Sequence, residues 1–194
     1  PLRLVGSEMC IRDSINSGSG NQGIAVSIPI IIYARERGCS EEQLYRALAF
    51  SNLLSIHLKR GIGRLSAFCG AVTATCASAA AIAYLEGATL KQIEMTISNT
   101  FANDTGIICD GAKPSCGAKI ATALDAAMMG RSLAMSNRGY ESDTGILKGD
   151  IEHTIAAVGK IGSQGMVLLD QKVLEIMLEL SLIHISEPTR RRGI

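Results

Sequence analysis

The sequence predicts an all-α protein, a compact multi-helix domain built around a buried central helix rich in Ala, Gly and Ser. Apolar residues recur at helical spacing through most of the 194 residues, whereas the alternation typical of strands is almost absent. Only 4% of the residues are aromatic in a chain that is 47% hydrophobic, so the core has to form by close approach of backbones. No residue from Leu65 to Leu85 is charged, and this stretch is the expected central helix.

Start and stop signals place the helices in order along the chain. The first helix is expected to begin at Ile24, after a loop rich in Gly and Ser. Ser40 followed by Glu41 and Glu42 is typical of an N-cap with acidic residues in the first helical turn. Glycines such as Gly106 mark several of the expected ends. The later helices are expected over residues 40–59, 66–85, 89–106, 118–135, 150–160 and 170–180.

The charge and the composition exclude some classes of binding partner and indicate the cellular compartment. The formal net charge of +1 provides no basic surface for nucleic acid or for an anionic membrane. The uncharged stretch is long enough to cross a bilayer, but it has few Leu or Ile residues and no aromatic belt, which favours the core of a soluble protein. Six cysteines without a signal peptide or a CxxC pair favour reduced thiols, hence a cytoplasmic protein without a disulfide framework or zinc ribbon.

The two ends of the chain do not continue the helical pattern. The segments PLRLVGSEMCIRDS and SLIHISEPTRRRGI resemble translated sequencing-adapter reads. We therefore expect residues 1–14 and 181–194 to be non-native segments that flank a domain over residues 15–180. On this expectation Cys10 and His184 have no functional role, and the domain is a fragment whose start is missing.

The stretch NSGSGNQG contains the spacing G-x-G-x-x-G at Gly18, Gly20 and Gly23. A dinucleotide fingerprint needs a buried strand before the first glycine, and the polar stretch EMCIRDSIN precedes it instead. A mobile linker is one alternative. Another is a loop that holds a carboxylate at the start of the following helix, through backbone N–H groups and polar side chains. The candidate substrate-binding residues are Asn16, Ser17, Ser19, Asn21 and Gln22, with Lys59 and Arg64 as the nearest cations.

Three cysteines form the strongest candidate metal site. Cys69 lies early in the uncharged helix, and Cys109 and Cys116 bracket the turn Asp-Gly-Ala-Lys-Pro-Ser. Thiolates are the ligands of iron–sulfur clusters, and three of them leave one iron open to act as a Lewis acid. Spacing alone favours buried, inert cysteines over a cluster site, and Cys76 is interpreted as such a core cysteine.

Three motifs in this order, NSGSGNQGI, GRLSAFCGAV and TGIICDGAKPSCGAKI, resemble the C-terminal alpha domain of the L-cysteine desulfidase family (UPF0597), which is related to the iron–sulfur L-serine dehydratases. The resemblance covers about residues 16–180. It implies a β-eliminating lyase that converts L-cysteine to pyruvate, ammonia and hydrogen sulfide with a [4Fe-4S] cluster. The family's ligands fall on Cys69 and Cys109, and Cys116 aligns with the third ligand of the serine dehydratases.

Two other functions stay open at this point: an L-serine dehydratase alpha domain and a non-catalytic helical binding or assembly module. The resemblance implies a small amino-acid substrate and a missing N-terminal region of the same enzyme as partners, and it is compatible with a homo-oligomer. The desulfidases also have an important cysteine near their N-terminus, which is the alternative to Cys116 as the third cluster ligand. No residue is assigned as the general base, and the missing N-terminal region is its expected source. The chain alone is therefore expected to be inactive.

Overall fold

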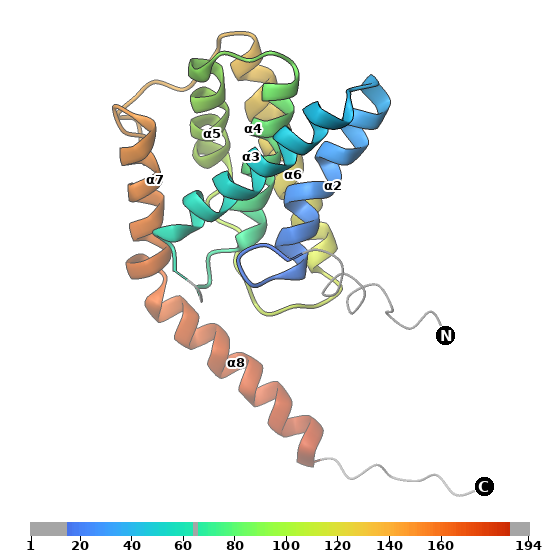
Figure 1. Ribbon diagram of the computed structural model, residues 1–194. Helices are drawn as coiled ribbons and strands as arrows, with labels where there is room; N and C mark the ends of the chain where they lie inside the picture. The colour runs from blue at the N-terminus through green and yellow to red at the C-terminus, as the bar shows by residue number, and fades with distance from the viewer. Residues whose placement is uncertain (1–14, 64–65, 187–194) are drawn as a thin grey trace, which may run out of the picture.

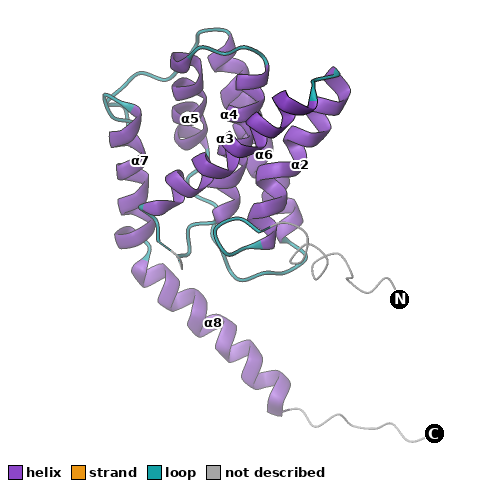
Figure 2. Ribbon diagram, viewed as in Figure 1, coloured by secondary structure: helices purple, strands orange, loops and turns teal. Residues whose placement is uncertain are grey.

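The computed structural model describes residues 15–63 and 66–186, with side chains described through Glu179. In these ranges the chain forms seven α-helices and one π-helical turn, and no strand, which confirms the predicted all-α fold (Figure 2). Two isolated β-bridges are the sole β-type pairings in the same ranges. The helices are α2 (Gly20–Arg37), α3 (Glu41–Arg60), α4 (Gly70–Leu85), α5 (Leu90–Asn103), α6 (Cys116–Met135), α7 (Ile151–Lys160) and α8 (Val167–Ser186).

Helix α4 is the centre of the domain. Every residue from Ala71 to Ala83 is buried, and α4 packs against α2, α3, α5 and α6 (Figure 1). Most of these side chains are Ala, Ser, Thr or Cys, so the neighbouring helices approach its backbone closely. The buried central helix that the sequence predicted is thereby confirmed. None of the described helices is long and apolar enough to span a bilayer.

Capping boxes begin α3 and α5. At α3 the Ser40 hydroxyl accepts the Gln43 N–H, and the Gln43 side chain accepts the Ser40 N–H. Thr89 and Gln92 make the same reciprocal pair at α5. These exchanges satisfy backbone donors that would otherwise have no partner in the first turn. Both helices consequently begin beside the residues that the sequence indicated.

Several predicted boundaries were wrong. Helix α2 begins at Gly20 instead of Ile24 and continues through Pro29 to Arg37. Helix α4 begins at Gly70 instead of Ser66, because the residues before it pair with a distant loop. Helix α6 begins two residues earlier than expected and α8 three residues earlier.

A π-helical turn, Ile161–Gly165, joins α7 to α8 and was not predicted. The Ser66 hydroxyl donates to the Gly162 carbonyl at 2.7 Å. Gly162 also permits close packing, because a Cβ added there would lie 2.7 Å from Cγ2 of Ile62. The turn is therefore held against the segment that follows the end of α3.

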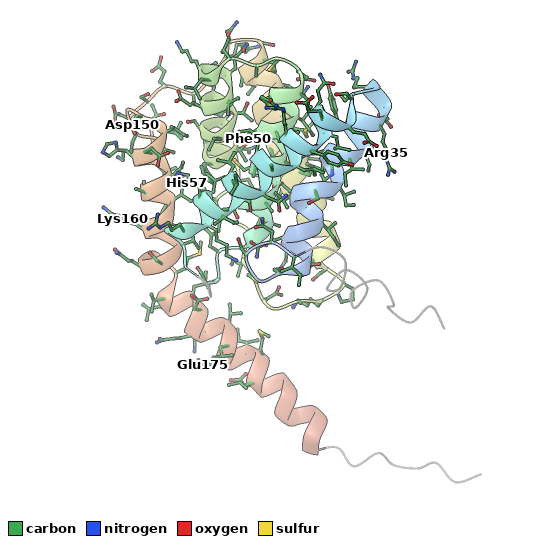
Figure 3. All side chains as sticks on the ribbon, in the orientation of Figure 1. Arg35, Phe50, His57, Asp150, Lys160 and Glu175 are labelled. Carbon is green, nitrogen blue, oxygen red and sulfur yellow. The ribbon has the colours of Figure 1, made fainter. Side chains whose placement is uncertain are left out.

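Helix α7 packs on α3, whereas α8 points away from the helical bundle (Figure 1). His57 lies on the side of α3 that faces α7, and its Nε2 is 3.0 Å from a carboxylate oxygen of Glu152 (Figure 3). Helix α8 continues past the expected domain boundary at residue 180. The expected non-native segment 1–14 and the residue Arg64 lie outside the described residues.

Candidate functional site

Two extended segments bring Cys69 and Cys109 together at the N-terminal end of α4. The Cys69 N–H donates to the Ile107 carbonyl at 3.0 Å, and the Cys109 N–H donates to the Ala67 carbonyl at 2.6 Å. Between these bonds Phe68 and Ile108 form an antiparallel bridge. Residues that are distant in sequence thus become neighbours before α4 begins.

Cys116 closes the loop that begins at Cys109, because it is the first residue of α6. Its Sγ accepts the Lys113 N–H at 3.4 Å and lies 3.5 Å from the Gly111 carbonyl oxygen. The loop therefore holds this sulfur by main-chain contacts on its own residues.

Cys69 lies within electrostatic range of the other two cysteines. Burial raises the pKa of its thiol, and the neighbouring Cys109 and Cys116 raise the pKa further. The Ala71 N–H, which donates to the Cys69 sulfur, and the Lys119 ammonium act in the opposite direction. The three candidate ligands thus share one electrostatic environment with a helix N-terminus and a lysine.

Whether the three cysteines can hold a metal group depends on whether that group is a single ion or a larger cluster. No three His, Cys, Asp or Glu side chains in the described ranges converge as the ligands of a single metal ion do. A cuboidal iron–sulfur cluster is larger, and thiolates bind it at separate corners. The donor set suits such a cluster, since the three sulfurs are soft ligands and two of them accept backbone N–H bonds.

Gln22 and Lys59 lie beside the cysteines. The Lys59 ammonium donates to the Gln22 Oε1 at 3.2 Å, and Gln22 is only 7% exposed. Gly70 makes room for this amide, because a Cβ at that position would lie 2.5 Å from the Gln22 Nε2. Helix α2, helix α3 and the start of α4 therefore meet at one side chain.

The Lys59 ammonium is the cation next to the cysteines that has no acidic partner among the described residues. Burial lowers its pKa, and the nearby Cys109 and Cys69 thiols raise it. An ammonium has three donors, and Gln22 accepts from one of them. An anionic group would satisfy both the remaining donors and the charge.

The loop before α2 is fixed to α3 by Asn16. Its Nδ2 donates to the Asn52 Oδ1 at 3.0 Å, and its Oδ1 accepts from the hydroxyls of Ser17 and Ser55. Ser17 has a positive φ of 52°, and Ser19 caps α2 by accepting the Gln22 N–H. The loop is therefore an ordered helix start, and Asn16 anchors it. Substrate contacts by Asn16, Ser17, Ser19, Asn21 and Gln22 stay predictions.

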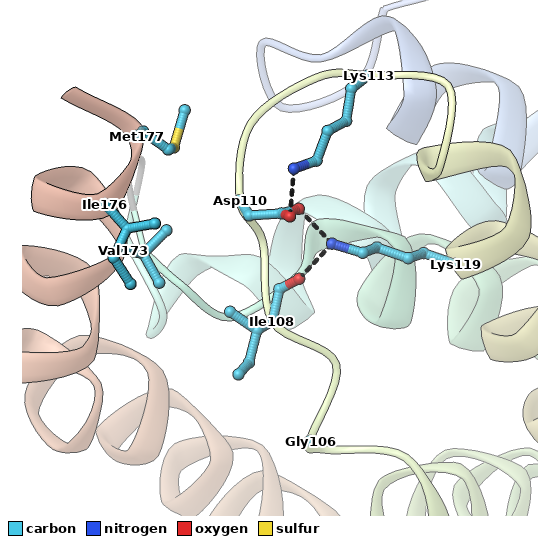
Figure 4. A pocket seen from close by; sticks show the side chains of 8 residues that line it. All are labelled: Gly106, Ile108, Asp110, Lys113, Lys119, Val173, Ile176 and Met177. Carbon is cyan, nitrogen blue, oxygen red and sulfur yellow. Dashed lines mark hydrogen bonds and ion pairs between the residues drawn. The ribbon is translucent and has the colours of Figure 1, made fainter. Parts of the chain in front are cut away.

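Asp110 and two lysines line an open pocket of about 470 Å³ between the cysteine loop and α8 (Figure 4). The Asp110 carboxylate pairs with both Lys113 and Lys119, which hold its pKa low, at about 2. The opposite wall is apolar and contains Val173, Ile176 and Met177 of α8. Both lysines of this pocket thus have an acidic partner, in contrast to Lys59.

Sequence reasoning did not select Gly70, Ser66 or Lys119 as parts of the site. Gly70 directly follows Cys69, and Lys119 lies one helical turn after Cys116, so proximity to a candidate ligand was the available signal. Ser66 gave no signal, because its partner Gly162 is far away in sequence. The structure also leaves Cys76 fully buried, with a pKa raised by burial to about 12, as expected for an inert core thiol.

The family model for the serine dehydratase alpha chain matches residues 6–175. A UPF0597 protein of Treponema denticola is 56% identical over 164 residues, which cover 84% of this chain and 38% of that protein. UPF0597 proteins of Finegoldia magna and Desulfitobacterium hafniense are 50% and 49% identical, over 85% and 91% of this chain and 40% of each relative. No solved structure matches the chain significantly.

These matches confirm the predicted resemblance to a serine dehydratase-like alpha domain of UPF0597 proteins. The chain spans about two fifths of the length of the curated relatives it matches. The fold, the ordered cysteine motifs and the matched range lead to one assignment: the chain belongs to the serine dehydratase alpha chain family.

Proposed function

We propose that this chain is part of an iron–sulfur-dependent β-eliminating lyase that converts L-cysteine to pyruvate, ammonia and hydrogen sulfide. The observation that carries the proposal is the pairing of the Cys69 and Cys109 segments at the start of α4, with Cys116 in electrostatic range of Cys69 and Lys59 in electrostatic range of Cys69 and Cys109. Iron–sulfur clusters need thiolate ligands, and the elimination needs a group that binds an amino-acid carboxylate. Thiol ligands and a cation that could bind a carboxylate both lie in this one region.

Cys69, Cys109 and Cys116 would hold a [4Fe-4S] cluster. With three protein ligands, the cluster would supply one open iron as a Lewis acid for the substrate. The Ala71 N–H donates to the Cys69 sulfur, and the Lys113 N–H donates to the Cys116 sulfur. The cluster-dependent chemistry is thus assigned to the region where the two extended segments pair.

The carboxylate of the substrate would bind to Lys59 and to the N-terminal turn of α2. Lys59 has unused donors and a partly desolvated charge, and its ammonium donates to Gln22. Backbone N–H groups at a helix start favour anions, so the loop before α2 would complete the site. Arg64 is a further proposed ligand of the same carboxylate.

The reaction breaks a Cα–H bond and the Cβ–S bond of L-cysteine. The proton goes to a base, the thiol leaves as hydrogen sulfide, and 2-aminoacrylate forms. This enamine tautomerises to an imine, and one water hydrolyses the imine to pyruvate and ammonia. We assign the base to the part of the longer relatives that lies outside this chain, so this chain alone is proposed to be inactive.

An L-serine dehydratase is the second candidate, because the family model that matches is the serine dehydratase alpha chain. That reaction follows the same steps but releases water from Cβ in place of hydrogen sulfide. A full-length UPF0597 protein of Treponema denticola would be assayed anaerobically with both amino acids. Sulfide together with pyruvate from L-cysteine supports the first proposal, whereas pyruvate from L-serine alone supports the second.

Cluster binding is tested on the 194-residue chain itself. After anaerobic reconstitution with iron and sulfide, we expect a charge-transfer band in the visible spectrum. The Cys69→Ala, Cys109→Ala double variant should lose this band, while Cys39→Ala, which removes a cysteine outside the site, should keep it. The same spectrum in all three chains would contradict the cluster assignment and favour a non-catalytic helical module.

A further inference from the structure

The Lys119 side chain bridges the two ends of the cysteine loop. Lys119 lies in the first turn of α6, the helix that begins at Cys116, and its ammonium extends back to the residues around Cys109 (Figure 4). It donates to the Ile108 carbonyl at 2.7 Å and pairs with the Asp110 carboxylate. These two acceptors directly precede and follow Cys109 in the chain.

The Ile108 carbonyl needs such a partner for a geometric reason. In the antiparallel bridge, the Ile107 carbonyl and the Cys109 N–H bond to the opposite segment. Successive carbonyls of an extended chain point to opposite sides, so the Ile108 carbonyl points away from that segment. Lys119 supplies the donor on this side.

Lys119 also has an electrostatic relation to the cysteines. Its pKa is raised, first by the bond to Asp110 and further by the nearby Cys69 and Cys116 thiols. The side chain is 24% exposed, compared with 43% for Lys113. Its positive charge therefore acts on the cysteines through a partly desolvated environment.

Lys113 provides a natural comparison within the same pocket. It pairs with the other oxygen of Asp110, but its described ammonium contacts include no loop carbonyl. A substitution of Lys113 thus removes a similar surface charge and leaves the bond to Ile108 in place.

We propose that Lys119 is a positioning residue of the cysteine loop, which fixes Cys109 through both of its chain neighbours and supplies a positive charge that favours the electron-rich state of a bound cluster. The part that concerns the cluster rests on the proposed function. The part that concerns the loop rests on the hydrogen bond to Ile108 and the pairing with Asp110 alone.

The loop part is tested by hydrogen exchange of the cluster-free chain, followed by mass spectrometry. In Lys119→Met, peptides that cover residues 107–113 should exchange about tenfold faster, as expected for the loss of a charge-assisted hydrogen bond. Lys113→Met should change the exchange much less, and Lys119→Arg should restore most of the protection. Equal acceleration in Lys119→Met and Lys113→Met would overturn the positioning role.

The charge part is tested by redox titration of the reconstituted chains. Removal of the positive charge in Lys119→Met should lower the midpoint potential relative to wild type and to Lys113→Met, and Lys119→Arg should keep it. An unchanged potential in Lys119→Met would overturn the electrostatic role. A wild-type chain that assembles no cluster would refute the proposed function, and the exchange comparison would still decide the role of Lys119 in the loop.

Discussion

The ammonium of Lys59 donates to the amide oxygen of Gln22 at 3.2 Å, across the junction of α2 and α3. Gln22 is nearly buried, and its amide occupies the space that the missing side chain of Gly70 leaves free. The orientation of the cation beside the cysteines therefore depends on a glycine in another helix. This dependence can be tested without any cofactor.

Gly70→Ala should destabilise the domain. The new Cβ would lie 2.5 Å from the Gln22 Nε2, so the amide or α4 has to move. Overpacking of this kind costs about 1–3 kcal/mol in the free energy of unfolding, which urea denaturation measures. Gly117→Ala in the first turn of α6 is the control, because a Cβ there meets no atom within 4 Å. Equal stabilities of the two variants would contradict the described packing.

Lys59→Met should weaken substrate binding in a catalytically competent longer protein without unfolding this domain. The substitution removes a cation that is partly buried and has no acidic partner among the described residues. Its removal therefore also removes the free-energy cost of desolvating that charge. We expect KM for the amino acid to rise by about tenfold or more, as for a lost charge-assisted contact, with a thermal midpoint at least as high as that of the wild type. An unchanged KM would remove Lys59 from the substrate site.

Asp104→Asn should stabilise the domain at neutral pH. Asp104 is 8% exposed, burial raises its pKa, and its Oδ2 has no hydrogen-bond partner among the described residues. A folded-state pKa above the unfolded value of 3.8 means that the native protein binds the extra proton, so stability falls as pH rises from 3.8 through the folded pKa. The gain from Asp104→Asn should therefore be largest at neutral pH, shrink as pH falls through the folded pKa, and be smallest below pH 3.8. A pH-independent difference in urea denaturation would contradict this ionisation.

Asp110→Asn should have the opposite pH dependence. Its pKa is lowered from 3.8 to about 2 by the pairs with Lys113 and Lys119. The stabilisation is complete above pH 4 and is lost as pH falls towards 2. The difference in unfolding free energy between wild type and Asp110→Asn should therefore be constant from pH 5 to 7 and shrink in acid. High salt should reduce it, because both lysines and the carboxylate contact solvent.

Alkylation of the native, cluster-free chain should distinguish the buried cysteine from the accessible ones. Cys76 is completely buried and its pKa is raised to about 12, so it should react with iodoacetamide only after denaturation. Cys109 and Cys116 are half-buried and should react under native conditions. Peptide mass spectrometry before and after the addition of urea provides both the measurement and its control. Early labelling of Cys76 would contradict its place in the core.

Features that depend on local sequence could be predicted. The capping residues Ser40 and Thr89 determine helix starts through bonds to residues three positions later. The uncharged stretch indicated a buried helix, because a helix that is apolar on all sides has to be enclosed by other helices. In these cases the physical cause lies within a few residues of its effect.

Features that depend on long-range pairing could not be predicted. The stretch from Ser66 to Cys69 has the composition of the following helix, but its bonds to Ile107 and Cys109 keep it extended. The meeting of Gln22 with Gly70 and the reach of Lys119 to Ile108 likewise arise from tertiary packing. The sequence therefore identified candidate ligands, and the structure revealed the residues that orient them.

The hydrogen bond from Ser66 to the carbonyl of Gly162 has a mechanical consequence. Gly162 lies in the π-helical turn from which α8 departs, and Ser66 leads directly into the extended segment that ends at Cys69. A rotation of α8 about that turn would therefore be transmitted along this bond to the segment that ends at Cys69.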